Sequence, residues 1–555
     1  MNRFTELFTL EFDANHPLVF TQLDFWIFFV LVLAVFSYIH KYKLTRSIFL
    51  FLTSLFFYFK TSGLLVLLLI SSIVVNYFIG KGLGKTQSST KKKTYVTFSV
   101  FFNLLILGYF KYAYFFTESF NEMFNTQFEV FNVFARMGNG IFGNGTFVDL
   151  IVLPVGVSFF TFQSISYVVD IFRKEVRPVK NFFDYAFFVS FFPQLVAGPI
   201  VRARDFIPQI RQPYELNKPD FSWAIIQIVK GFIKKVILAD YIAVHFIDKV
   251  ADAPEAFPGF ISIIAMWGYS LQIYGDFSGY TDIAIGTSRL MGFKLLENFN
   301  SPYKAINVAD FWRRWHKSLG SWLRDYLYIP LGGNRGGGLG TYIATIVILI
   351  FMIFITQWYW LLFIYIGLLA LYIGFSLLFP TFKRYVHRDL NLIITMVIGG
   401  LWHGASENFV IWGAMNGAAL ILYNHWKKIS PYENITSWVV RFWRILFTFN
   451  FITFTRIWFR LEDDGAPATM LGQIWNHFDL NTETFQTLMT GFDTALYVMI
   501  FGFILHWLPN KTKIYGEKKF ANLPMFIQSI VVAILIIMIY QAFSDGFKPF
   551  VYFQF

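Results

Sequence analysis

The chain has 555 residues, of which 56% are hydrophobic and only 14% are charged, well below the roughly 25% charged residues of ordinary soluble proteins. Its net charge of +12 indicates basic loops beside anionic lipid rather than a nucleic-acid partner, and the sequence has no cysteine, which excludes disulfides, thiol catalysis and cysteine-ligated metals. We therefore predict an all-α, multi-pass membrane protein that forms a single domain over residues 1–555.

Apolar runs alternate with loops of opposite charge in the first third of the chain. Residues 1–17 and 117–149 are acidic, whereas residues 81–93 and 173–180 are basic. Basic loops stay in the cytoplasm, so the N-terminus is predicted outside, and the acidic start lacks the basic segment of a cleaved signal peptide. The expected helices run over about 24–39, 47–59, 63–80, 95–116 and 150–172.

A short apolar stretch, Phe187–Pro199, begins and ends beside basic segments and is too short to span a membrane. A re-entrant element that closes with Gln194-Leu195-Val196-Ala197-Gly198-Pro199 explains both facts. Residues 461–494 contain six acids and no lysine or arginine, so they are predicted outside. A last helix is expected over about 524–541, which gives about eleven membrane-embedded segments in all.

Residues 310–327 have the pattern of an interfacial amphipathic helix. At about 100° per residue, a basic polar arc faces an apolar, aromatic side. His316 falls on the apolar side and is predicted to point into the protein at the cytoplasmic face, where a cytosolic cosubstrate would enter; a structural core histidine is the alternative. The polar arc holds Asp310, Arg313, Arg314, Lys317, Ser321, Arg324 and Asp325.

His403 lies in Ile398-Gly399-Gly400-Leu401-Trp402-His403-Gly404, inside an apolar run. An ionisable side chain there is costly and suggests function. About a dozen residues of helix place it roughly 20 Å above the basic segment that ends at Arg388, at the break of a helical hairpin within the bilayer. Burial is expected to lower the imidazole pKa and leave a neutral general base. The alternative is a structural histidine bonded to a carbonyl.

Other constellations are less specific. Asp276 and Asp282 lie in a polar stretch and are expected to orient a histidine or to pair with Arg313 or Arg314; ion-pair scaffolding is the favoured role. The glycine-rich segment Gly332–Gly338 lacks the Lys-Ser/Thr of a phosphate loop and is predicted to be a flexible basic loop. The other histidines form no ligand-spaced pair, so no metal is predicted.

Four motifs together resemble the membrane-bound O-acyltransferase family, and most closely its alginate O-acetylation branch. The similarity covers about residues 20–460 and extends in character to Tyr552-Phe553-Gln554-Phe555. The motifs are Leu153-Pro154-Val155-Gly156-Val157-Ser158-Phe159-Phe160-Thr161-Phe162-Gln163, Tyr274-Gly275-Asp276-Phe277-Ser278-Gly279-Tyr280-Thr281-Asp282, Phe311-Trp312-Arg313-Arg314-Trp315-His316 through Arg324-Asp325-Tyr326 to Gly332-Gly333-Asn334, and Gly400-Leu401-Trp402-His403-Gly404.

This resemblance implies a ring of helices around a funnel and a tunnel, with further helices at 495–555. His403 corresponds to the family's tunnel histidine, and His316 to a second, less universal one. The family role implied is transfer of an acyl group, usually acetyl, from a cytoplasmic thioester such as acetyl-CoA towards an extracytoplasmic polysaccharide or cell-wall glycan. No bound cofactor is expected. Supporting tunnel positions are expected at Asp276, Trp402, Trp315, Asn408 and Gln163, and donor phosphates are expected near Arg313, Arg314, Lys317 and Arg335.

The resemblance also implies a bacterial inner-membrane location and a separate periplasmic, hydrolase-like acetyltransferase that completes the transfer. The sequence leaves the acyl group and the acceptor polymer open. Transfer of D-alanine to teichoic acid or of longer chains to lipids remains an alternative, as do a glycan or lipid transporter and a non-catalytic scaffold.

Overall fold

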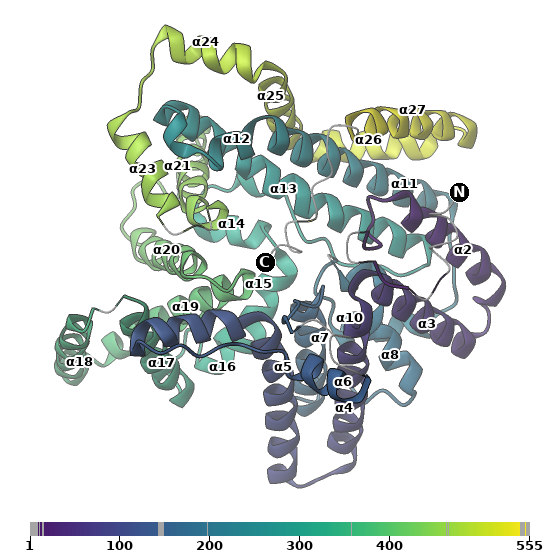
Figure 1. Cartoon of the computed structure of the whole chain (residues 1–555), viewed down its shortest axis with the longest axis horizontal. Helices are drawn as coiled ribbons and strands as arrows, with labels where there is room; N and C mark the ends of the chain where they lie inside the picture. The colour runs from purple at the N-terminus through teal and green to yellow at the C-terminus, as the bar shows by residue number, and fades with distance from the viewer. Residues whose placement is uncertain are drawn as a thin grey trace.

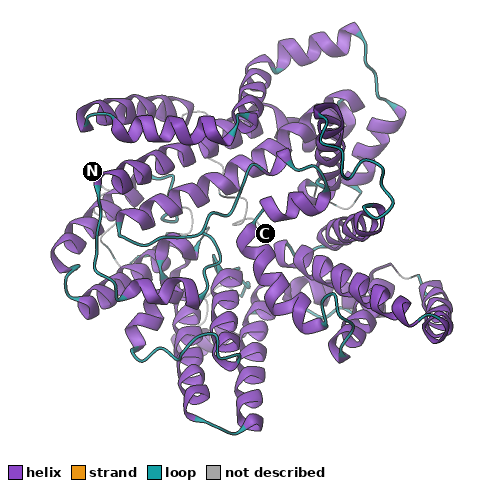
Figure 2. Ribbon diagram, turned by 180° about the vertical axis from the view of Figure 1, so that it is seen from behind, coloured by secondary structure: helices purple, strands orange, loops and turns teal. Residues whose placement is uncertain are grey.

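The computed structural model describes residues 9, 11–13, 16–142, 149–196, 198–356, 358–461, 463, 465–543 and 550. Every regular element in these ranges is a helix, as Figure 2 shows, so the all-α prediction is confirmed. Residues 1–8, Ala197 of the predicted re-entrant element and the terminal Tyr552–Phe555 motif lie outside the described residues.

The first half of the chain supplies a series of helices that ends with the long, buried α13 (Figure 1). They are α2 (Leu23–Ile39), α3 (Lys43–Ser62), α4 (Val66–Lys85), α5 (Ser89–Phe124), α6 (Val133–Phe142), α7 (Val157–Phe172), α8 (Phe182–Ser190), α9 (Phe192–Leu195), α10 (Ala203–Ile210), α11 (Lys218–Phe232), α12 (Asp248–Ala251) and α13 (Gly259–Leu290), with 3-10 turns at Gly63–Leu65 and Pro254–Ala256 and π-helical turns at Ile233–Tyr241 and Ala243–Ile247.

The second half begins with short broken helices and ends with longer ones. After a 3-10 turn at Pro302–Lys304 come α14 (Val308–Arg314), α15 (Lys317–Leu323), a π-helical turn (Arg324–Tyr328), α16 (Ile329–Leu331), α17 (Leu339–Thr356), α18 (Trp360–Leu378), α19 (Pro380–His403), α20 (Glu407–Trp426), α21 (Trp438–Thr455), α22 (Ile457–Arg460), α23 (Ala466–Asn476), α24 (Thr482–Gly491), α25 (Asp493–Trp507), α26 (Asn510–Asn522) and α27 (Met525–Phe543).

Three helical stretches of the described chain are long and apolar enough to cross a membrane: Lys43–Lys85, Ser89–Phe124 and Trp360–Leu378. A fourth is added if α24 and α25, which are bent by 86°, count as one span. The helices expected near 24–39, 95–116 and 524–541 are present as α2, α5 and α27. The total of about eleven embedded segments stays a prediction, because shorter apolar helices such as α2 and α7 fall below the length of a full span.

The helix expected from residue 150 begins later, at Val157. Gly156 precedes it with a φ of +74°, a left-handed conformation that glycine adopts without steric cost. The regular helix therefore starts only after this residue. The stretch proposed as re-entrant, Phe187–Pro199, contains the end of α8 and all of α9, with a break at Phe191, and its described residues are buried. That break fits non-helical backbone held against protein.

The amphipathic helix predicted over residues 310–327 is wrong as one continuous element. It breaks at Trp315–His316, where His316 takes a left-handed φ of +41°. Asn298 lies against the break: its carbonyl accepts from Lys317 N at 2.9 Å and its side-chain oxygen accepts from Ser318 N at 3.1 Å. These bonds satisfy backbone N–H donors in the first turn of α15, as capping side chains do. The segment α15 therefore begins as a separate helix.

The helical hairpin predicted around His403 is confirmed as α19 and α20, which pack along each other. Glycine allows their close approach. A Cβ at Gly400 would lie 2.2 Å from the backbone oxygen of Phe409, and one at Gly404 would lie 1.9 Å from the Phe409 ring. The glycines around His403 are therefore needed for helix contact at the point where the chain reverses.

Replacing Gly400 by alanine is expected to push α19 and α20 apart, because its methyl group would meet rigid backbone. Overpacking of this kind costs about 1–3 kcal/mol, so the melting temperature of the detergent-solubilised protein should fall by several degrees. Gly374→Ala in α18 is the matched control, since a Cβ there meets open space. Equal melting temperatures for both variants would contradict the packing argument.

Candidate active site

His403 is the last residue of α19 and is buried, with 2% of its surface exposed. The end of the helix is held by α5: the Lys111 ammonium donates to the carbonyls of Trp402 at 2.6 Å and His403 at 3.0 Å. The Tyr112 hydroxyl donates to Leu401 O at 2.6 Å. The last carbonyls of a helix lack intrahelical partners and carry partial negative charge, so a buried lysine is well suited to this position and fixes the backbone of His403.

His316 reaches the same place from the break between α14 and α15. It is 1% exposed, and its ring centroid lies 6.4 Å from that of His403 and 5.7 Å from that of Trp402. The two histidines that the sequence singled out thus meet in the interior, although 87 positions separate them in the chain (403 − 316). No group of three or more His, Cys, Asp or Glu that could hold a metal occurs in the described ranges.

The protonation of His316 follows from Asn298. The backbone N–H of Ser318 donates to Asn298 Oδ1 at 3.1 Å, and Ser318 Oγ donates to it at 3.0 Å, which identifies that atom as an acceptor. His316 Nδ1, at 3.2 Å, therefore donates to it; the competing contact from Leu319 N to Nδ1 is longer, at 3.4 Å. The neutral ring then carries its proton on Nδ1, and Nε2 keeps a lone pair without a hydrogen-bond partner in the part of the chain that the structure describes.

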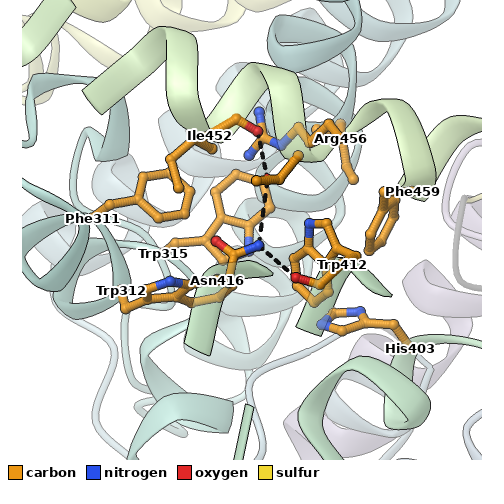
Figure 3. Close-up of a pocket in the computed structure, with 11 residues that line it drawn as sticks. Phe311, Trp312, Trp315, His403, Trp412, Asn416, Ile452, Arg456 and Phe459 are labelled. Carbon is orange, nitrogen blue, oxygen red and sulfur yellow. Dashed lines mark hydrogen bonds between the residues drawn. The ribbon is translucent and has the colours of Figure 1, made fainter. Parts of the chain in front are cut away.

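His403 and Arg456 line the same small cavity (Figure 3). Its volume is about 10 Å³, room for about one water molecule. Aromatic rings form most of its wall, and its polar members are His403, Asn416, Thr455 and Arg456. The wall consists of Ile273, Phe311, Trp312, Trp315, His403, Trp412, Asn416, Ile452, Thr455, Arg456 and Phe459.

Asp276 and Asp282 form ion pairs, as the favoured expectation for them had it, but with lysines rather than with Arg313 or Arg314. The Asp276 carboxylate is paired with the Lys235 ammonium at 2.7 Å, and Lys235 also reaches Asp240 at 2.7 Å. Asp282 likewise pairs with Lys234 at 2.6 Å. The sequence predicted ion-pair scaffolding for these acids but missed the partners, which come from the π-helical turn after α11.

The other predicted tunnel positions divide into two groups. Trp315 lines the cavity, and Trp402 stacks against the residues around it, with its ring 5.7 Å from that of Phe162. The amide of Gln163 is buried without a hydrogen-bond partner in the described chain. Asn408 is not among the cavity residues, and its side chain donates to Leu461 O at 2.8 Å. Asn416, further along the same helix α20, lines the cavity instead.

The basic residues predicted to receive the donor lie at the rim of the fold. Arg313 and Arg314 both pair with Asp310, at 3.5 and 3.0 Å, and Arg335 is exposed. Two lysines that the sequence analysis did not single out gather nearby. Burial and the neighbouring Arg314 and Arg441 lower the pKa of Lys304, and burial and Lys304 lower the pKa of Lys513 to about 8.

The family model described as "MBOAT, membrane-bound O-acyltransferase family" matches residues 18–384. The chain belongs to the membrane-bound O-acyltransferase family. It is an O-acyltransferase and a membrane protein. The family match ends before His403, so the position of that residue in the site comes from the structure.

Bacterial relatives of this acyltransferase are similar over most of their length. It is 33% identical to the "Probable alginate O-acetylase AlgI" of Pseudomonas syringae pv. tomato, covering 82% of this chain and 75% of the relative. It is 33% identical to the "Peptidoglycan O-acetyltransferase" of Helicobacter pylori, covering 78% and 75%. A "Teichoic acid D-alanyltransferase" of Bacillus subtilis is 28% identical, covering 54% and 67%.

Sequence reasoning missed three residues of the acyltransferase site: Lys111, Asn416 and Arg456. A usable signal existed for two of them. Lys111 is the one charged residue in the apolar run 94–117, and Arg456 follows a run of eleven residues without charge, 445–455. A charge inside a membrane-embedded run suggests function or a specific partner. Asn416 carries no such signal, because an amide on an apolar helix has many structural roles.

Replacing Lys111 by methionine should leave the carbonyls of Trp402 and His403 without donors. An unsatisfied buried acceptor costs about 1–3 kcal/mol, and the freed helix end should misplace the imidazole. We expect a lower melting temperature and at least tenfold slower acyl transfer. Lys93→Met, at an exposed position of α5, is the control; a Lys111→Met protein with wild-type transfer would show that this anchor is dispensable.

Proposed function

We propose that the protein transfers an acetyl group from a cytoplasmic thioester such as acetyl-CoA to a hydroxyl of an extracytoplasmic polysaccharide or cell-wall glycan. The observation that carries the proposal is the meeting of two buried histidines, with ring centroids 6.4 Å apart, beside a cavity lined by aromatic rings. The names of the alginate and peptidoglycan relatives support acetyl transfer to a glycan.

The reaction requires a general base and a second group that can hold or relay the proton. In this mechanism neutral His403 takes the proton of the attacking hydroxyl and returns it to the departing thiolate, as a general base and then a general acid. His316, with its Nε2 lone pair directed away from Asn298, is the group that can hold or relay that proton. Transient acylation of His403 is the variant of this mechanism that also fits the geometry.

The cavity favours acetyl over D-alanyl transfer. A D-alanyl thioester carries an ammonium group next to the reacting carbonyl, and Arg456 places a positive charge in the wall of the same cavity as His403. Like charges in a buried, low-dielectric site repel strongly. A volume of about 10 Å³, room for about one water molecule, also leaves no space for a long acyl chain.

An acceptor route is available on the other side of Phe459. The Phe459 ring lies 5.3 Å from that of His403, and the next residues, Arg460 and Leu461, line a second cavity of about 350 Å³. Carboxylates of Asp252, Glu255 and Asp463 are in its wall. Such oxygens accept hydrogen bonds from sugar hydroxyls, and this region belongs to the acidic part of the chain predicted outside.

The donor route begins at the opposite, basic side. Lys513 Nζ donates to Ser301 Oγ at 3.4 Å and Lys304 Nζ donates to Leu508 O at 2.6 Å, so both ammonium groups lie around the loop that leads to Tyr303 and α14. Together with Arg314 they form a cationic rim suited to the phosphates of CoA. Arg313, Lys317 and Arg335 remain proposed outer members of this rim.

Location and partner complete the proposal. We place the protein in the bacterial inner membrane with its N-terminus outside, on the charge pattern of its loops. A separate periplasmic, hydrolase-like acetyltransferase is the proposed second enzyme, which would receive the acetyl group at the outer cavity.

The test is thioester turnover by the purified protein with radiolabelled acetyl-CoA and a glycan acceptor, with free CoA and transferred label as readouts. His403→Ala should lower transfer by at least a thousandfold and His316→Ala by about a hundredfold, since general-base catalysis contributes about 10²–10⁴. The control is His387→Ala, outside the cavity. Full transfer by folded His403→Ala would refute the assignment.

The donor rim predicts a pH dependence. Because the pKa of Lys513 is lowered to about 8, this lysine is charged below pH 8 and becomes neutral as the pH rises through 8. The KM for acetyl-CoA should therefore rise several-fold between pH 7 and 9, with little change in kcat. Lys513→Gln should show the high KM throughout, and Lys518→Gln, exposed on the same helix, should behave as wild type. A flat wild-type profile would remove Lys513 from the rim.

A further inference from the structure

Arg456 follows α21 and is buried, with 3% of its surface exposed. Its Nη1 donates to the Tyr303 hydroxyl at 2.6 Å and, more weakly, to Ser270 O at 3.5 Å. The Tyr303 hydroxyl in turn donates to Ser270 O. One side of the guanidinium is thus tied to neutral oxygens of α13 and the adjoining loop.

Arg456 has no negative partner: in the described parts of the chain, no carboxylate lies within ion-pair distance of it. By contrast, its neighbours along the chain are paired, Arg444 with Glu433 at 2.9 Å and Arg460 with Asp248 at 2.9 Å. Aromatic rings take part of the charge, since the guanidinium carbon lies 4.7 Å from the ring centroid of Trp315 and 5.2 Å from that of Tyr303. Cation–π contacts alone do not replace an anion at a buried site.

The same cavity wall holds an unsatisfied donor. Trp312 lines it, and the indole Nε1–H of Trp312 is buried without a hydrogen-bond partner among the described residues. Buried polar groups in native proteins are normally paired. A charged guanidinium and a free N–H around a cavity of one-water size, which His403 also lines, therefore point to a small ligand atom that carries negative charge.

We propose that Arg456 is a catalytic residue that binds the thioester carbonyl oxygen and stabilises the oxyanion formed on it, with the Trp312 N–H as second donor. The inference rests on the proposed acyl transfer from a thioester. Preorganised donors aimed at developing negative charge are a large source of rate enhancement, and a guanidinium without a resident counter-ion is free for that task.

The acceptor oxygen forms a bond to the carbonyl carbon while His403 takes the hydroxyl proton, and the π electrons of the carbonyl move to its oxygen, which Arg456 and Trp312 hold. The oxyanion then collapses, the carbon–sulfur bond breaks, and the thiolate leaves with the proton from His403. The products are the acetyl ester and the free thiol, and Arg456 keeps its own proton throughout.

The experiment compares affinity for a tetrahedral analogue with affinity for the ground state. The probe is a trifluoromethyl ketone analogue of acetyl-CoA, whose hydrate resembles the tetrahedral adduct. Arg456→Met should bind it at least a hundredfold more weakly than wild type, while its affinity for CoA changes less than threefold. Trp312→Phe, which keeps the ring and removes the N–H, should weaken analogue binding about tenfold.

Folding and specificity have their own controls. Arg384→Met removes an exposed arginine near the start of α19, outside the cavity and the proposed rim, and should bind the analogue like wild type. If the methionine variant fails to fold, Arg456→Lys is used in its place. It keeps the positive charge and should recover part of the affinity for the analogue. A purely structural role for Arg456 would change both affinities together, which would overturn the inference.

Turnover of acetyl-CoA is measured in parallel to separate the two proposals. If the wild-type protein turns over acetyl-CoA, and Arg456→Met binds the analogue and reacts as well as the wild type, the oxyanion role is contradicted and the proposed function is not. Wild-type protein that neither turns over nor binds the analogue contradicts the proposed function, and the inference with it. A loss of kcat of about 10²–10³ in Arg456→Met with KM unchanged supports both.

Discussion

The cost of burying charge organises this protein. A cation removed from water must find an anion or several oxygens, or it destabilises the fold by several kcal/mol. Lys235 lies between two carboxylates at 2.7 Å each, Lys234 pairs with Asp282, and Lys111 closes the end of a helix. The contacts of Lys235 with Asp276, of Lys234 with Asp282 and of Lys111 with the end of α19 join elements that are distant in sequence. Arg456 contacts two neutral oxygens but no carboxylate in the described parts of the chain, and it lies in the cavity that His403 also lines.

The site therefore depends on breaks between helices, and hydrogen bonds at the helix ends hold these breaks in place. Asn298 supplies oxygens to the start of α15 and turns His316 inward, while the glycines of α19 let α20 return closely enough to leave His403 at the reversal. Neither histidine lies in the middle of a regular helix. Helix ends leave backbone groups unpaired, which gives side chains at these points both polar contacts and access to space.

Sequence reasoning succeeded where a property is local. Composition gave the all-α membrane class, apolar runs gave α2, α5 and α27, and glycines beside a buried histidine gave the α19–α20 hairpin. It failed where distant groups decide. A wheel over residues 310–327 cannot include Asn298, whose oxygens break the helix, and no pattern links Asp276 to Lys235 across two helices. Arg456 could have been noticed as a charge in an apolar run, but its lack of a carboxylate is visible only in three dimensions.

Phe459 has a consequence that concerns the membrane rather than the reaction. Its ring touches the His403 ring at 5.3 Å, and the residues directly after it line the larger cavity. In the proposed topology, the Phe459 ring then lies between the His403 cavity and the cavity that faces outside. A protein that passes an acyl group across must still block ions and protons, and a bulky aromatic ring at this point would oppose their passage. The large rings around His403 would therefore serve the permeability barrier of the membrane as well as the reaction.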